Sequence, residues 1–133
     1  MADVVTSQII FDGDREAVMK FTNVSDGTGE AAVLKVSAAA LAQSYAGKAC
    51  DGVTLERVHV SCKTMSVSLL WDATSDVPAF IAAPGVYTFD FTKIQMWNNA
   101  GAGVTGDILF TTIGAAAGAT YTIVLEMVKS YAA

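Results

Sequence analysis

The sequence is poor in charged residues and has a single histidine. Charged residues make up 16% of its 133 positions, against roughly 25% in an average globular protein. Eight Lys and Arg against 13 Asp and Glu give a net charge of -5, the wrong sign for neutralising a phosphate backbone. We therefore expect no nucleic-acid partner. Because 53% of the residues are hydrophobic, we expect the subunit to bury part of its surface against copies of itself or a larger scaffold.

Long apolar runs and a secretory leader are also missing. No run of 18 apolar residues occurs, and the N-terminal Met-Ala-Asp-Val-Val-Thr has neither a basic nor an apolar leader region. These absences predict a soluble protein made in the cytoplasm, with no membrane partner. In that compartment Cys50 and Cys62, the only cysteines, are expected to be reduced, buried thiols. A chain of this length buries a core without disulfides or metals, so residues 1–133 should form one domain.

Alternation of apolar and polar residues with a period of two is the main pattern present, and it is typical of strands with one buried face. It is clearest in Met65–Trp71, Tyr87–Thr92 and Tyr121–Met127. Five further segments favour extended chain: Val4–Phe11, Ala17–Val24, Ala31–Val36, Val53–Cys62 and Asp107–Ile113. Turns rich in Gly, Asn and Asp separate them. About eight short strands predict an all-β, antiparallel β-sandwich of jelly-roll type, with a barrel as the rival.

One segment competes for helix. Ser37–Tyr45 is rich in Ala, with Ser37 as a candidate N-cap and Gly47 placed to end it. The segment predicts one or two turns of helix or an irregular crossover.

Motifs that carry chemistry are weak throughout. Gly101–Gly106 matches G-x-G-x-x-G, but β-forming residues follow it where a dinucleotide site needs a helix, so a glycine loop between strands is expected. The single histidine, His59, sits beside Arg57 on the polar face of its strand, and no triad partner is apparent. A zinc site would need Cys50, Cys62 and His59 to converge, without a recognised spacing to support it.

Acidic pairs at Asp12 and Asp14, and at Asp72 and Asp76, are better explained by turn chemistry than by calcium. We therefore predict no catalytic, cofactor-binding or metal-binding residues.

Trp97, with the adjacent Asn98 and Asn99, is the candidate interface. Aromatic residues are enriched in interface cores, and loops on a rigid sandwich often carry recognition. The alternative is that Trp97 folds back and caps the end of the core.

Four blocks of the sequence resemble small virion structural proteins of tailed bacteriophages: Asp51–His59, Leu69–Thr74, Asn98–Ile108 and Gly118–Met127. The resemblance covers most of the chain from about Asp51 onward. It implies a capsid decoration or cement protein, a small β-sandwich on the outside of a mature head at junctions between major capsid subunits. It implies no catalytic residues.

These observations favour a non-enzymatic virion structural protein made in the host cytoplasm. Its expected partners are the major capsid protein or other virion proteins and copies of itself, with a trimer as one option. Many identical weak contacts on a symmetric shell add up through multivalency. The alternatives are a tail, neck or fibre component of a phage, and a carbohydrate-binding jelly roll. An enzyme ranks last, because nucleophile, base and oxyanion donors cannot all be assigned.

Overall fold

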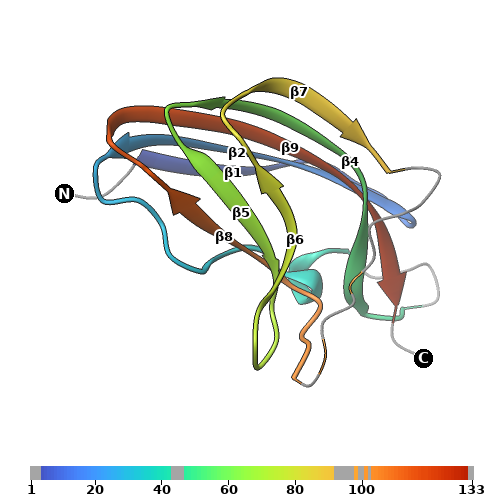
Figure 1. The fold of residues 1–133 in the computed structure, drawn as a ribbon. Helices are drawn as coiled ribbons and strands as arrows, with labels where there is room; N and C mark the ends of the chain where they lie inside the picture. The colour runs from blue at the N-terminus through green and yellow to red at the C-terminus, as the bar shows by residue number, and fades with distance from the viewer. Residues whose placement is uncertain (1–3, 43–46, 92–97, 99–100, 102, 132–133) are drawn as a thin grey trace.

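The computed structural model describes residues 4–42, 47–91, 98, 101 and 103–131, and in this part the chain is all-β (Figure 1). It forms nine strands and one 3-10 turn, η1. In chain order they are β1 (Val4–Asp12), β2 (Glu16–Asp26), β3 (Val33–Val36), η1 (Ala38–Ala40), β4 (Cys50–Lys63), β5 (Ser66–Trp71), β6 (Val77–Ala82), β7 (Gly85–Asp90), β8 (Ile108–Ile113) and β9 (Ala117–Tyr131). The predicted antiparallel sandwich is confirmed, with one strand more than expected.

The strands form two antiparallel sheets that face each other. The five-stranded sheet has the order β1-β2-β9-β4-β7, and the four-stranded sheet has the order β3-β8-β5-β6. Without β1, eight strands remain in two sheets of four, and every connection among them except β5 to β6 passes from one sheet to the other. This is the jelly-roll arrangement. Strand β1 is an addition beside β2 at one edge (Figure 1).

The strand that the sequence pattern missed is β6. It contains Pro78 and has no clean alternation of apolar and polar residues. Proline is tolerated there because β6 is an edge strand, where one side of the ladder has no partner that needs an N–H donor. A register shift between Leu69 and Leu70 of the neighbouring strand further disturbs the pattern.

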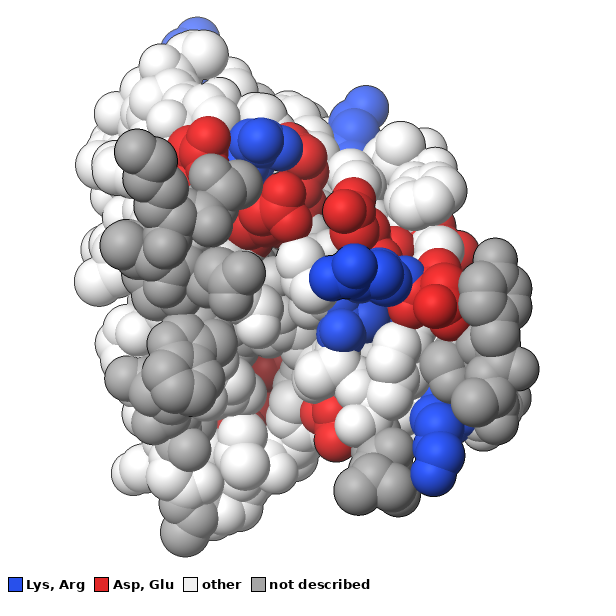
Figure 2. All heavy atoms as spheres, turned by 90° about the vertical axis from the view of Figure 1, so that its right-hand side faces the viewer, with Lys and Arg blue, Asp and Glu red and all other residues white. Residues whose placement is uncertain are grey.

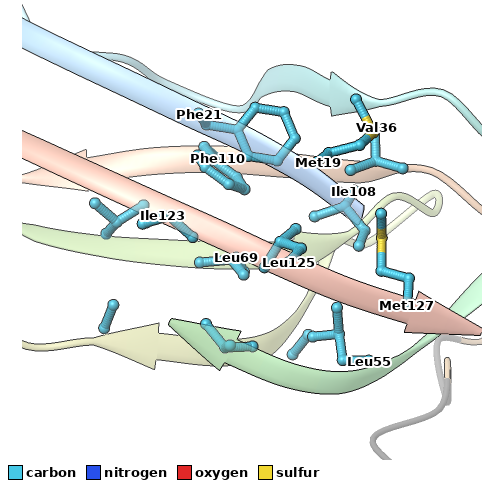
Figure 3. Close-up of a cluster of buried hydrophobic side chains, with 14 of the residues drawn as sticks. Met19, Phe21, Val36, Leu55, Leu69, Ile108, Phe110, Ile123, Leu125 and Met127 are labelled. Atoms are coloured by element: carbon cyan, nitrogen blue, oxygen red, sulfur yellow. The ribbon is translucent and has the colours of Figure 1, made fainter. Parts of the chain in front are cut away.

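Side chains from both sheets meet in one apolar layer (Figure 3). Phe21 of β2 and Phe110 of β8 pack edge to face, with ring centroids 5.1 Å apart. Trp71, Ile123 and Leu125 are almost completely buried, as their alternation predicted. Burial of this kind stabilises by roughly 1.5–3 kcal/mol per large side chain.

The Ala-rich segment contains one helical turn in its described part. Up to residue 42 that turn is η1, and the Ser37 side chain makes no capping hydrogen bond. Instead, the carboxylate of Asp107 accepts a hydrogen bond from the Ala38 N–H at 2.8 Å. Residues 43–46 of the predicted segment lie outside the described residues. The part of the chain that the structure describes contains no helix long and apolar enough to cross a membrane.

A buried ammonium group holds one end of the sandwich together. The Nζ atom of Lys129 lies 2.6 Å from Asp12 Oδ1 and donates to the carbonyls of Gly13 and Ala42, each at 2.8 Å. Burial lowers the Lys129 pKa, but the bonds to Asp12 and Tyr131 outweigh it and raise the pKa overall. Lys129 thereby ties the β1–β2 turn to the segment after η1.

A second buried ion pair lies near the other end of β2. Lys35 Nζ is 2.5 Å from Glu30 Oε2, and both side chains are almost fully buried. The other carboxylate oxygen of Glu30 accepts bonds from Tyr121 Oη at 2.6 Å and Asn23 Nδ2 at 2.9 Å. The loop between β2 and β3 is thus anchored to the core by a network of hydrogen-bonded charges.

Candidate functional site

The lone histidine lies on the outer face of the five-stranded sheet, as its alternation with Val58 and Val60 predicted. Its register places His59 between Thr88 of β7 and Val124 of β9. Nδ1 of His59 lies 3.0 Å from Thr88 Oγ1, and Nε2 bonds to the carboxylate of Glu126.

Arg57 and Glu126 complete this cluster across neighbouring strands. Arg57 donates to Glu126 Oε1 at 3.1 Å, and its Nε lies 3.5 Å from Asp90. A register shift between Leu55 and Arg57 reverses the alternation of inward-facing and outward-facing residues along β4. Arg57 and His59 face outward as a result, and the residues before the shift alternate in the opposite phase.

The cluster stabilises the charged form of Glu126. The hydrogen bond with His59, and then the one from Arg57, lower the pKa of this carboxyl, and partial burial opposes them. The same contact with Glu126, followed by the charge of Asp90, raises the pKa of Arg57. The face is partly exposed, with His59 at 39% and Glu126 at 29%, so the contacts are screened by solvent.

A hydroxyl, an imidazole and a carboxylate in contact superficially resemble a hydrolase triad. His59 is paired with Thr88 and with Val124 in the two sheet ladders on either side of β4. The adjoining depression is shallow, about 260 Å³, and is lined by strand side chains such as Ser61 and Thr122. The arrangement joins β4, β7 and β9 across their outer face.

The cysteines cannot form a metal site or a disulfide with each other. Cys50 and Cys62 stand near opposite ends of β4, and twelve residues of strand span about 40 Å. Both thiols are free and buried. Burial raises the pKa of both, that of Cys62 to about 11, so they are protonated near neutral pH.

Asp12 and Asp72 are used as hydrogen-bond acceptors for local structure. Asp12 binds Lys129 and the Ala42 N–H, and Asp72 accepts from Thr105 Oγ1 at 2.8 Å. Asp76 accepts from the Ala73 N–H at 3.1 Å. Among the described residues, no group of three His, Cys, Asp or Glu side chains is placed to hold a metal ion.

The glycine motif precedes a strand, as the residues after it predicted. Gly106 has φ +86°, and a Cβ there would lie 1.9 Å from the carbonyl oxygen of Asp51. Strand β8 begins at Ile108, so no helix N-terminus faces the loop. The last glycine of the motif allows close backbone packing against the start of β4.

The candidate interface is only partly described. Trp97 and Asn99 lie outside the described residues. Asn98 is half-buried and lines a groove of about 540 Å³ together with Asp51, Thr105 and Ser130. The other tryptophan, Trp71, is 1% exposed and offers no platform for a sugar ring.

Large apolar side chains are exposed at both edges of the sandwich, and sequence reasoning did not locate them. At one edge they lie on β1 and its neighbour β2: Val4, Val5, Ile9, Ile10, Phe11 and Val24, each 43–68% exposed. At the opposite edge Ile81 of β6 is 57% exposed, Val86 of β7 is 83% exposed and Phe89 of β7 is 45% exposed. Isolated exposed apolar residues are ordinary, but groups of them mark contact surfaces.

We call the second of these edges the β6–β7 patch (Ile81, Val86 and Phe89), and it differs from prediction. Within it Val86 and Phe89 point to opposite faces of β7, since Val86 pairs with exposed Ser61 and Phe89 with buried Val58. Phe89 was expected on a buried face, yet it is exposed because β7 is the last strand of its sheet and β6 covers it only in part. Its ring packs edge to face with Phe80 at 4.9 Å and Tyr87 at 5.4 Å. A hollow of about 320 Å³ opens beside Ile81 and Phe89.

At the end of the molecule that lies to the right in Figure 1, positively and negatively charged residues are mixed on the surface. Figure 2 shows this end, where the central group of basic atoms lies directly beside acidic ones. Such mixed charge gives no extended positive field for a polyanion.

Comparisons of the chain with protein-family models, with curated proteins and with solved structures find no significant match. The resemblance to tailed-phage virion proteins therefore stays a prediction.

Proposed function

We propose that this protein is a non-enzymatic virion structural protein of the capsid decoration or cement type, which binds the shell formed by a major capsid protein. The observation that carries the proposal is the pair of open, apolar sheet edges at opposite sides of one rigid jelly roll. A subunit with two contact surfaces can join two neighbours, as a cement protein must.

The β6–β7 patch is the surface we assign to the shell. It combines exposed aliphatic groups with an aromatic cluster that is held by the core, which is the composition of an interface centre. Because the rings are already packed against each other, little side-chain entropy is lost when a partner covers them.

The remaining chemistry is compatible with this role. The polar cluster around His59 bridges three strands, and the pocket beside it that the described residues form is an open depression. Jelly rolls are common among viral capsid proteins, although they also occur in lectins and cupins, so this support is by analogy of fold.

The test is binding to heads purified from the phage that encodes the protein. The wild-type chain should bind expanded, DNA-free heads to a saturating ratio and raise their melting temperature, because a ligand that binds only the intact shell stabilises it. The double variant Ile81→Lys/Val86→Lys should lose this binding. Val104→Lys/Ile113→Lys, which places the same two charges at exposed apolar positions outside both edges, is the matched control and should retain it.

Failure of the wild-type chain to bind heads would refute the decoration proposal. Antibody labelling of intact virions locates the protein independently. Signal confined to the tail would replace the proposal with the tail, neck or fibre alternative.

A further inference from the structure

Strand β1 lies outside the eight-stranded jelly roll. Among the residues that the structure describes it pairs only with β2, and none of its own residues belongs to the buried core. Eight of its nine residues are exposed and the last, Asp12, is half-buried. Ordering a strand costs backbone conformational entropy at every residue, and β1 recovers little of this cost through burial.

The free edge of β1 lacks the devices that keep edge strands from pairing. Natural edges are blunted by charged side chains, by proline or by coverage with another segment. From Val4 to Phe11 the strand has no charged residue and no proline. A register shift between Ile9 and Phe11 disturbs only its last part. The stretch from Val4 to Ile9 is therefore open to another strand.

The pattern of this strand reads the same in both directions. Two apolar residues, three small or amide polar residues and two apolar residues follow one another, Val4-Val5-Thr6-Ser7-Gln8-Ile9-Ile10. In an antiparallel pair centred on Ser7, Val5 of one strand lies opposite Ile9 of the other, and Val4 lies opposite Ile10. Such self-complementarity is what a twofold contact requires, because each patch must fit itself.

We propose that β1 pairs with β1 of a second copy of this chain, antiparallel about a twofold axis at Ser7, to give a continuous ten-stranded sheet. The inference deepens the proposed function, on which it rests for the role of the edges, by naming the occupant of one of them.

The sheet faces support this register. Val5 pairs with Asn23 and Ile9 with Met19, both of which are buried, so Val5 and Ile9 point to the inner face of the sheet. Val5 is nevertheless 43% exposed and Ile9 52% exposed. In the dimer Val5 of one copy lies opposite Ile9 of the other on each side of the central Ser7 pair, so each side chain gains an apolar neighbour that it lacks in the monomer.

The size of the contact is adequate but small. The apolar side chains of β1 expose on the order of 500 Å² in each copy, so a pair covers at most roughly 1,000 Å², near the lower limit for specific interfaces. Backbone hydrogen bonds between the two strands add to this contact. A dimer of this size should dissociate in the micromolar range.

The experiment is sedimentation equilibrium of the full chain at about 1 to 300 µM, the range expected for such an interface. The wild-type chain should approach twice the monomer mass at the upper end. Val5→Lys and Ile9→Glu should each shift the dissociation to at least about tenfold higher concentration, since each places two unpaired charges in the contact. Both side chains are well exposed in the monomer, so the melting temperature should stay close to that of the wild type.

Combining the two substitutions provides a test of register. In the double variant Val5→Lys/Ile9→Glu, the lysine of one copy opposes the glutamate of the other at both ends of the pair, so dimerisation should recover. Val86→Lys, at the β6–β7 patch, is the matched control and should dimerise like the wild type.

A wild-type chain that stays monomeric, or that forms a trimer, would overturn the inference. So would a dimer that both single variants leave intact, or a double variant that is no better than either single one. Failure of the proposed function looks different, because head binding would then be absent while the dimer persists.

Discussion

The substitution Gly106→Ala tests the close contact between the glycine loop and the start of β4. Gly106 has φ +86°, and the carbonyl oxygen of Asp51 lies 1.9 Å from where an alanine Cβ would stand. The loop cannot easily move away, because the N–H of Thr105 donates to Asp72 O and the N–H of Asp72 donates to Asp107 O, both at 3.1 Å. The added methyl group therefore has to displace backbone on one side or the other.

Gly118→Ala is the matched control. Gly118 has almost the same φ, +87°, but nothing lies within 4 Å of its ideal Cβ position. The left-handed backbone alone costs an L-residue about 1–2 kcal/mol. Overpacking adds about 1–3 kcal/mol at a tight site. We therefore expect Gly118→Ala to lower the free energy of unfolding by about 1–2 kcal/mol and Gly106→Ala by about 2–5 kcal/mol.

The assay is urea denaturation of both variants and the wild type at one protein concentration, followed by circular dichroism. The loss for Gly106→Ala is a large share of the 5–15 kcal/mol that typically stabilises a domain, so its midpoint should fall far below that of Gly118→Ala. Equal losses for the two variants, within about 0.5 kcal/mol, would refute the reasoning, because steric contact with Asp51 would then contribute nothing.

Two further predictions follow from ionisable groups. The pKa of Glu126 is lower in the folded chain than in the unfolded chain, so its contribution to stability is present at neutral pH and is lost as pH falls through the folded-state pKa. Urea midpoints between pH 7 and pH 3 should accordingly fall less steeply for Glu126→Gln than for the wild type, and parallel curves would contradict this. Because burial raises the pKa of Cys50 and of Cys62, the latter to about 11, neither thiol should react with a disulfide reagent at neutral pH until denaturant is added. Prompt reaction of the native protein would show that the start or the end of β4 opens readily.

The sequence was sufficient to predict the fold class because two-residue alternation directly reports which side of a strand is buried. Trp71 and Leu125 are buried as expected, and the Gly101–Gly106 motif precedes a strand as its following residues indicated. The alternation fails where a strand is at an edge or is interrupted. Pro78 concealed β6, and Phe89 lies on a partly uncovered strand.

The candidate surfaces were much harder to predict than the core. Glu126 lies far from His59 in the sequence, and only the order β9-β4-β7 brings the two side chains together. Likewise, nothing in the segment Val4–Phe11 shows whether its strand is covered by the second sheet or left exposed. That depends on where the four-stranded sheet packs, which the segment itself does not determine. Lys129 follows the inward-facing register of Met127, where composition alone would predict an exposed charge.

The central place of β9 has a consequence for how the molecule is made. Ala117–Tyr131 is the last of the described strands, yet it lies between β2 and β4 and pairs with both along their length. During synthesis the β1–β2 hairpin and the β4 strand exist before the segment that joins them, and the pairing of Glu16 with Val128 closes a loop of more than roughly 100 residues. Contacts so distant in sequence place the protein among slowly folding β topologies. A nascent chain thus exposes two halves of a sheet to the cell until the residues of β9 emerge from the ribosome.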